Sequence, residues 1–337
     1  MAAEDFTLPK GTHTVALGLG DLNGIMRGKR IPASNWDNIC KNGNALSAAL
    51  FAIDMTCDVW DTPYVNMDNG YPDMHLFPIT KPVSLPWEPG VALAFARAEG
   101  MDHKPVPIDP RQVLIRQLDR AEKLGVEIKV GAELEFYLLD PETGMPKDKG
   151  NGVYSLERAA ELEHVLGPIR NNINEIGIPV EQSNPEYAEG QVEVNIRYDE
   201  ALLAADRVVT FRNVVKQLAF KHGYKATFMA NPFFEQSGSG FHCHYSLWKN
   251  GKNIFADNIR QFNVYHNDQI VAGTTIFLTK NVIHIQYIGS DTNKNKLGSL
   301  DFLFYKLINE LFTDYKFFDF GTSNENNGRK INSGLLY

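Results

Sequence analysis

The stretch V-G-A-E-L-E-F-Y-L-L at residues 130–139 alternates apolar and polar side chains with a period of two. Two later stretches do the same, G-Q-V-E-V-N-I-R-Y at 190–198 and G-F-H-C-H-Y-S-L-W at 240–248. Because successive side chains of a β-strand point to opposite faces, each stretch predicts a strand with one apolar and one polar face. Taken singly, each is also what an ordinary half-exposed strand looks like.

The polar residues on these three predicted faces are of the kind that bind metal ions. They are Glu133, Glu135, Gln191, Glu193, Asn195, His242, His244 and Ser246. No Lys or Arg stands among them, and carboxylates without counter-ions repel one another unless a cation lies between them. Such a set suits Mg²⁺ or Mn²⁺ better than Zn²⁺. Glu186, ahead of Glu193, could add a ligand from the preceding loop, and two such metals could bridge phosphate oxygens during phosphoryl transfer.

Composition bounds the class of protein. The chain has 337 residues, 43% hydrophobic and 22% charged, which is typical of a globular protein of two or three domains. A net charge of −8 without a basic cluster argues against nucleic acid as a partner. Three widely spaced cysteines favour reduced thiols, and no signal peptide or membrane-length apolar run is evident. We therefore expect a soluble, cytoplasmic protein with no membrane partner.

Composition changes near residue 259. All 17 prolines lie at or before Pro232, and Ala272 is the single alanine after Asn258, where Asn, Phe and Lys become frequent. This change indicates either a domain boundary or a fusion, or an assembly or frame error, that joins unrelated sequences.

The coarse pattern predicts further elements on both sides of that change. We expect a strand at 13–21, then a turn and a short helix ending at Gly43, and a helix from Asp109 to Gly125. The apolar stripe of that last helix is Val113, Leu114, Leu118, Ala121 and Leu124. After residue 259 we expect strands at 262–289, a helix at 300–313, a strand at 315–323 and the start of a helix at 327–337.

Five ordered segments resemble the glutamine synthetase superfamily. They are D-L-N-G-I-M-R-G-K (21–29), P-I-D-P-R-Q-V-L (107–114), G-A-E-L-E-F (131–136), E-Y-A-E-G-Q-V-E (186–193) and G-S-G-F-H-C-H-Y-S (238–246). The R-G-K-R-I-P opening and Ser237, where many glutamine synthetases carry Asn, look more like the γ-glutamyl-amine ligase branch. The resemblance implies an α+β fold: a small N-terminal β-grasp domain at 1–103 and the N-terminal half of an antiparallel-sheet catalytic domain at 104–258.

The resemblance also implies roles. Glu135, Glu186 and Glu193 would hold a metal at the acyl and ammonia site, and Glu133 and His242 a metal that orients the ATP phosphates. Gly238 would face glutamate, while Tyr198, His244 and Ser246 would lie along the nucleotide. Asp58 would deprotonate ammonium across a subunit boundary. The implied cofactors are ATP with Mg²⁺ or Mn²⁺, the substrates are glutamate with ammonia or an alkylamine or polyamine, and the family forms homo-oligomeric rings.

Other family features are not found after Lys252. These are an Arg-rich segment, a flap glutamate and an R-x-E-x-R strand, so we expect a truncated catalytic domain with impaired activity and assembly. Residues 259–337 are similar to part of a GNAT or FemAB-like acyltransferase domain, where the helix start G-S-L-D-F (298–302) would approach acyl-CoA. A generic αβ segment explains this tail equally well.

Three functions follow from these expectations. The first is a glutamate–ammonia or glutamate–amine ligase acting through γ-glutamyl phosphate. The second is a non-catalytic fragment or chimera that retains the metal strands. The third is an acyl-CoA-dependent N-acyltransferase acting through the C-terminal segment.

Overall fold

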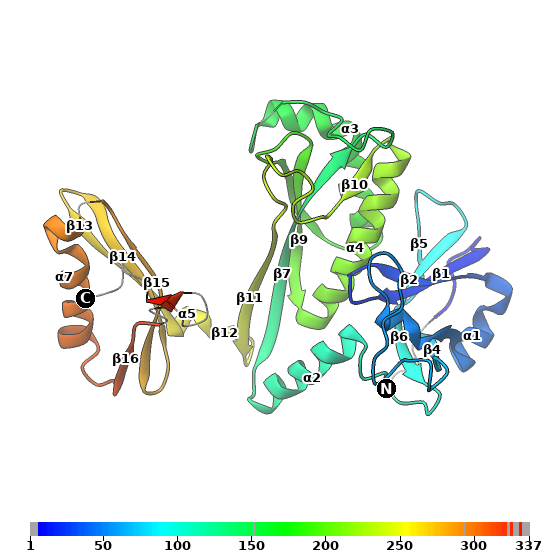
Figure 1. Cartoon of the computed structure of the whole chain (residues 1–337), viewed down its shortest axis with the longest axis horizontal. Coiled ribbons are helices and arrows are strands. Elements are labelled where there is room, and N and C mark those ends of the chain that lie inside the picture. The colour runs from blue at the N-terminus through cyan, green and yellow to red at the C-terminus, as the bar shows by residue number, and fades with distance from the viewer. Residues whose placement is uncertain (1–5, 151, 293, 322–323, 326–329, 332–337) are drawn as a thin grey trace. The chain divides into compact units, whose positions relative to one another are not determined.

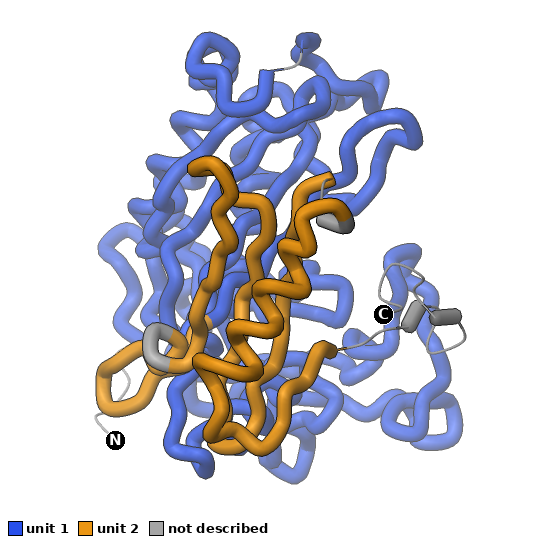
Figure 2. Tube along the Cα trace, turned by 90° about the vertical axis from the view of Figure 1, so that its left-hand side faces the viewer, with its two compact units in different colours: residues 1–245 blue, residues 246–337 orange. Residues whose placement is uncertain are grey.

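The computed structural model describes residues 6–150, 152–292, 294–321, 324–325 and 330–331. They fall into two compact units, residues 1–245 and 246–337, which Figure 2 colours separately. Each unit is described by itself below. Within the described ranges, no helix has both the length and the apolar character needed to cross a membrane.

Unit 1 begins with a six-stranded sheet. Its strands are β1 (Thr14–Gly20), β2 (Met26–Pro32), β3 (Asn44–Ser47), β4 (Asp73–Pro78), β5 (Val83–Ser84) and β6 (Val91–Gly100). They follow the order β2-β1-β6-β4-β3, with β5 on β6, and β1 runs parallel to β6. Helix α1 (Trp36–Asn42) follows a 3₁₀ turn, η1 (Ala33–Asn35). α1 and a second 3₁₀ turn, η2 (Ala48–Ala52), contribute buried side chains to the core of this sheet.

The first predicted strand and the short helix before Gly43 are confirmed. Gly43 ends α1 with φ +73°, a conformation that glycine adopts without strain. The turn predicted between them is wrong at residues 27–32, which lie in β2 and pair antiparallel with β1. The pattern was misleading because only Ile31 of β2 is buried; the strand lies at the edge of the sheet and exposes Lys29 and Arg30.

The second sheet of unit 1 carries the three alternating stretches. Its strands are β7 (Glu127–Leu139), β8 (Val180–Pro185), β9 (Gln191–Glu200), β10 (Lys225–Thr227), β11 (Phe241–Lys249) and β12 (Lys252–Asn253). Their order is β12-β11-β7-β9-β8, with β10 on β7. All three predicted strands are therefore present, and they are neighbours in one sheet. β11 runs across the division between the two units.

Helices cover one face of this second sheet. They are α3 (Leu156–Glu175) and α4 (Ala201–Lys221), and their apolar side chains share one core with Leu134, Phe136, Val192 and Val194 of the strands. Helix α2 (Pro110–Lys123) begins at the N-cap Asp109, whose side chain accepts a hydrogen bond from the Arg111 amide, as predicted. Of its apolar stripe only Ala121 is buried, and Leu124 is 77% exposed.

Helix α4 also packs against the first sheet. Leu85 and Trp87 in the turn between β5 and β6, with Val91 and Leu93 of β6, share a core with apolar side chains of α4. Those of α4 are Phe211, Val214, Val215 and Leu218. The Trp87 indole donates a hydrogen bond to Gln217 Oε1 at 3.0 Å. Figure 1 shows α4 between the sheet of β1 and β6 and the sheet of β7 and β9. The two sheets of unit 1 are therefore joined through one shared helix.

Unit 2 contains a separate four-stranded sheet, β13 (Ile259–His266), β14 (Gln269–Leu278), β15 (Val282–Ser290) and β16 (Phe317–Asp319), in that order. The first three strands are antiparallel, and β16 runs parallel to β15. Its helices are α5 (Phe255–Asn258), α6 (Lys294–Leu297) and α7 (Ser299–Lys306), which a π-helical turn η3 (Leu307–Leu311) continues. Ala272 of β14 packs with Leu300, Leu303 and Leu307.

The strands predicted at 262–289 are confirmed by β13, β14 and β15, and the helix predicted at 300–313 is confirmed by α7 with η3. Of the strand predicted at 315–323, Phe317–Asp319 forms β16, and residues 322–323 lie outside the described residues. The predicted helix at 327–337 is wrong at Lys330–Ile331, which forms strand β18 and pairs with β17 (Asn324–Glu325). The rest of that segment lies outside the described residues. The compact units do not coincide with the three expected domains, so the boundaries after 103 and 258 stay predictions, as does the β-grasp assignment.

Candidate metal site

Three residues of the second sheet bring ligand atoms together. One ligand atom from each of Glu133, Glu193 and His242 lies within 4.8 Å of the others. Each comes from a different strand, β7, β9 and β11. Adjacent strands place side chains of the same face about 5 Å apart, so three neighbouring strands suffice to build this group.

Register explains why carboxylates meet here. Glu135 of β7 lies directly opposite Glu193 of β9, and Glu133 lies opposite Asn195. Like charges placed opposite one another in a sheet repel and destabilise it. Glu193 and Asn195 are 7% and 6% exposed, and Glu186 is 6% exposed. The polar face that the sequence predicted is therefore buried on β9.

Burial and mutual repulsion act on the acidic side chains. Burial raises the pKa of Glu193, and the charges of Glu133 and Glu186 raise it further. Burial likewise raises the pKa of Glu186, with a second contribution from Glu135. Both shifts mean that the ionised carboxylates lack sufficient stabilisation, which a bound cation would supply.

The pKa of Glu133 shifts in the opposite direction to those of Glu186 and Glu193, because two histidines contact it. His242 Nδ1 and His244 Nε2 each lie 3.1 Å from a Glu133 oxygen. Burial acts to raise the pKa of Glu133, but the hydrogen bonds with His244 and His242 outweigh it, and the net pKa is lowered. His244, predicted to lie along a nucleotide, therefore contacts a predicted metal ligand.

The donor set fits a hard divalent cation. Carboxylate oxygens with one or two imidazoles match Mg²⁺ or Mn²⁺. Asn195 Oδ1 is in addition a buried acceptor without a hydrogen-bond partner among the described residues. A buried acceptor left unpaired costs free energy that a cation or a cation-bound water would offset.

Glu135 and Gly238 are brought together by a side chain that the sequence did not single out for this role. Gln191 is 2% exposed, and its amide donates to Glu135 Oε2 at 2.8 Å and to the Gly238 carbonyl at 3.0 Å. Glu186 accepts a hydrogen bond from Asn184 Nδ2 at 2.9 Å. Two predicted ligands are thus fixed by neutral amides.

Three other predicted residues have their own surroundings. Tyr198 is 51% exposed near the end of β9, and Ser246 accepts a hydrogen bond from the Trp248 indole at 2.8 Å. Asp58 lies in an exposed loop of the first sheet, where its carboxylate accepts a hydrogen bond from Thr56 Oγ1 at 2.8 Å. Among the described residues, no contact joins Asp58 to Glu133 or Glu193.

Tyr154 is a site residue that the alternation pattern missed. The charge of Glu186 raises the pKa of its phenol, with smaller contributions from burial and from Glu193. Its backbone amide donates a hydrogen bond at 3.1 Å to the carbonyl of Pro185, the residue before Glu186. It is 68% exposed and has φ +59°, an unusual conformation for an aromatic residue. A residue in a loop has no strand periodicity, and the only local signal is Ser155, which caps α3.

Comparisons with known proteins identify the family of the chain. The family model described as "Glutamine synthetase, catalytic domain" matches residues 107–280. A glutamate–isopropylamine ligase from Pseudomonas sp is 34% identical over 260 residues, which cover 73% of this chain and 57% of the relative. A glutamine synthetase from Rhizobium meliloti (strain 1021) is 32% identical over 266 residues, covering 77% of this chain and 58% of the relative.

A solved structure points the same way. The structure of a GmaS/ADP complex superimposes with a TM-score of 0.64 at 30% identity, over 73% of this chain and 56% of that one. The family model and this structural match define a catalytic domain of the glutamine synthetase type. The chain belongs to the glutamine synthetase family. It spans a little over half the length of these relatives, and the family match extends past Asn258 to residue 280.

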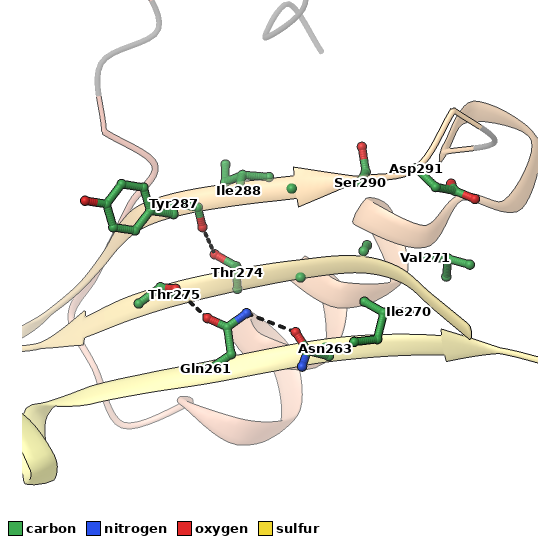
Figure 3. Close-up of a pocket in the computed structure, with 13 residues that line it drawn as sticks. Gln261, Asn263, Ile270, Val271, Thr274, Thr275, Tyr287, Ile288, Ser290 and Asp291 are labelled. Carbon is green, nitrogen blue, oxygen red and sulfur yellow. Dashed lines mark hydrogen bonds between the residues drawn. The ribbon is translucent and has the colours of Figure 1, made fainter. Parts of the chain in front are cut away.

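Unit 2 has a pocket of its own, of about 380 Å³, on one face of its sheet. Figure 3 shows Gln261, which accepts a hydrogen bond from Thr275 Oγ1 and donates to Asn263 Oδ1 at 2.9 Å. Gly273 and Gly289, paired across β14 and β15, line the same pocket. None of its lining residues belongs to the acidic group.

Proposed function

We propose that this chain is the metal-holding part of an ATP-dependent ligase that joins the γ-carboxylate of glutamate to ammonia or an amine through γ-glutamyl phosphate. The observation that carries the proposal is the group of ligand atoms from Glu133, Glu193 and His242 within 4.8 Å. The relatives support it, because one is a glutamate–isopropylamine ligase and another a glutamine synthetase.

The side chains would divide into two metal sites. Glu135, Glu186 and Glu193 would hold the ion on the acyl and amine side, and Glu133 and His242 the ion on the phosphate side. When bound, Mg²⁺ or Mn²⁺ would neutralise charge on the transferring phosphoryl group. His244 contacts Glu133, so its proposed place along the nucleotide adjoins the phosphate side.

Other residues would bind and orient the substrates. Gly238 would face glutamate, and Tyr198 and Ser246 would lie along ATP. Burial of Glu186 and Glu193 favours exclusion of water from the acyl phosphate, which water would otherwise hydrolyse. The phenol of Tyr154, beside Glu186, would line the amine side and favour an alkylamine or polyamine over ammonia by adding apolar contact.

The domain organisation belongs to the same proposal. The parallel pairing of β1 with β6 supports a β-grasp domain at residues 1–103. Asp58 in that domain would deprotonate the ammonium of a neighbouring subunit in a homo-oligomeric ring, since no contact within the described residues joins it to Glu133 or Glu193. Catalytic activity of the chain by itself is part of what the experiment below decides.

The experiment measures metal binding and turnover separately. Purified chain is titrated with Mn²⁺ by calorimetry, then assayed for phosphate release with ATP, glutamate and ammonia, methylamine, isopropylamine or a polyamine, with mass spectrometry of the γ-glutamyl product. Glu193→Gln should abolish Mn²⁺ binding, and Glu181→Gln on the exposed side of β8 is the matched control. Turnover dependent on Glu193 supports the ligase. Mn²⁺ binding without turnover supports the non-catalytic reading, and no Mn²⁺ binding contradicts both.

A second candidate function concerns unit 2 alone. Among the described residues, strand β15 pairs with the parallel β16 over residues 282–284 and not along its later residues. Helix α7 begins after Gly298 (φ +60°), and the buried Ser299 Oγ has no partner among the described residues. These features favour an acyl-CoA-dependent N-acyltransferase. Thiol release from acetyl-CoA with amine acceptors tests it, and absence of thiol release over a range of acceptors contradicts it.

A further inference from the structure

The side chain of Gln191 uses its amide to connect three separate parts of unit 1. Its Oε1 accepts a hydrogen bond from the Ala188 amide at 3.1 Å. Its Nε2 donates one hydrogen bond to Glu135 Oε2 at 2.8 Å and another to the Gly238 carbonyl at 3.0 Å. The residue is 2% exposed, so water does not compete for these bonds.

Those bonds select one oxygen of Glu135. Oε2 is engaged by Gln191, which leaves Oε1 for a ligand. A Cβ placed on Gly240 would lie 2.6 Å from Glu135 Oε1 and 2.9 Å from His242 Nε2. The free oxygen therefore faces the space above Gly240, on the same side as the free nitrogen of a second predicted metal ligand.

The hydrogen bond from Gln191 to the Gly238 carbonyl is one of several that hold the glycine loop, defined here as residues 237–240. The Tyr137 hydroxyl donates to the Ser237 carbonyl at 2.5 Å, and the Ser239 amide donates to the Ala230 carbonyl at 2.7 Å. The Glu135 amide donates to the Gly240 carbonyl at 3.1 Å. Tyr137 thus contacts the loop without contacting Glu135 through its hydroxyl, whereas Gln191 contacts both.

We propose that Gln191 is a positioning residue that locks the Glu135 carboxylate and the glycine loop into one arrangement, so that the metal ligand and the substrate-facing loop move together. This inference rests on the proposed ligase function for the identity of the metal and the substrate. Only a neutral amide suits the position, since it offers two donors and an acceptor without adding charge. Glutamate has the same shape but offers acceptors alone, and methionine has similar length and no donor.

The test compares Gln191→Met and Gln191→Glu with Tyr137→Phe, which removes one loop contact and leaves Glu135 untouched. Hydrogen exchange of the loop amides is measured without metal, and Mn²⁺ affinity is measured by calorimetry. Both Gln191 variants should exchange the loop several-fold faster, and Gln191→Met should weaken Mn²⁺ binding roughly 10–100-fold, as loss of a ligand-orienting partner does. Tyr137→Phe should speed loop exchange while leaving Mn²⁺ affinity within about 3-fold.

Measuring loop exchange and Mn²⁺ affinity separately distinguishes a positioning role of Gln191 from a general loss of stability. A purely structural role would give Gln191→Met and Tyr137→Phe the same pattern, and that outcome overturns the inference. So does loop exchange in Gln191→Met and Gln191→Glu equal to that of the unmodified chain. If the unmodified chain binds no Mn²⁺, the proposed metal function fails, and the metal-free exchange alone decides whether Gln191 holds the loop.

Discussion

Strands β9 and β11 carry the same alternating pattern but lie in opposite surroundings. On β9 both faces are buried from Gln191 to Ile196. On β11 residues 241–245 are all exposed, including Phe241 at 57% and Tyr245 at 63%. β9 lies between β7 and β8 and contacts α4. Among the described residues, β11 has β7 on one side and the two-residue β12 on the other. Alternation therefore determines which side chains share a face, and neighbouring elements determine whether that face is buried.

The largest expected effect is on the free energy of unfolding. The same change, Phe to Ala, is made at a buried position of β7 and at an exposed position of β11. Phe136 of β7 is fully buried and packs on Phe228 with ring centroids 5.0 Å apart. Phe136→Ala should lower the free energy of unfolding by about 3–5 kcal/mol, because it leaves a cavity in the core. Phe241→Ala on β11 should cost less than about 1 kcal/mol. Urea unfolding followed by tryptophan fluorescence gives both values. Equal losses would mean that the apolar face of β11 is covered in solution.

A second effect concerns burial of a charge. Burial raises the pKa of Asp109 to about 6, whereas hydrogen bonds from Thr56 and Trp60 lower that of Asp54, in a surface loop, to about 2. Folded chain holds the Asp109 proton more tightly than unfolded chain does. Its contribution to stability is therefore largest below about pH 4 and falls as pH rises to 6, by on the order of 2–3 kcal/mol.

Asp109→Asn should remove that fall, because asparagine also caps helices but carries no charge. Asp54→Asn should change the opposite side of the profile: the stabilisation from Asp54 is present above about pH 4 and is lost as pH falls through 2. Urea midpoints measured from pH 3 to 7 distinguish the two. An unchanged slope between pH 4 and 6 in Asp109→Asn would contradict the buried-charge explanation.

A smaller effect is expected at the acidic group itself. Glu193→Gln should raise metal-free stability by about 1 kcal/mol, because it removes a carboxylate that faces Glu135 across the sheet. The stabilisation that added Mn²⁺ confers on the unmodified chain should disappear in this variant. His244→Gln on the exposed β11 should leave metal-free stability within about 0.5 kcal/mol. Thermal unfolding with and without Mn²⁺ checks both, and a metal-free loss in Glu193→Gln would argue against repulsion.

The smallest effect uses cysteines as probes of exposure. Cys243 on β11 is exposed and Cys40 is half-buried, while burial raises the thiol pKa of both residues. A thiol reagent should therefore modify Cys243 faster than Cys40, with Cys243→Ser as the control. Slow modification of Cys243 would again mean that the apolar side of β11 is covered.

Much of the site could be predicted from the sequence because strand periodicity is local. The alternation around Glu133, Glu193 and His242 predicted the strands, their shared faces and the presence of a metal-type ligand set. It did not predict that the polar face of β9 would be buried or that of β11 exposed, since both depend on elements distant in sequence. Tyr154 was missed because it lies in a loop and belongs to no alternating strand. Gln191 was named among the polar residues, but its bridging role was missed because its contacts reach residues 56 and 47 positions away.

The features of the fold likewise divide into those with a local sequence signal and those without one. Asp109 and Gly43 mark helix ends through local backbone chemistry, and both were predicted. Strand β2 was not, because an edge strand with exposed Lys29 and Arg30 has little apolar alternation. The pairing of β1 with β6, separated by some seventy residues, has no local signal at all.

Helix α4, shared between the two sheets of unit 1, has a consequence for synthesis of the chain on the ribosome. The first sheet is complete at Gly100, but the helix that covers Leu85, Trp87 and Leu93 begins at Ala201. Because the ribosome adds about 5–20 residues per second, these apolar side chains stay exposed for roughly 5–20 s before α4 is synthesised. During that interval the nascent chain exposes an apolar surface that favours aggregation. Its yield of folded protein in cells should therefore depend on chaperones that act at the ribosome exit.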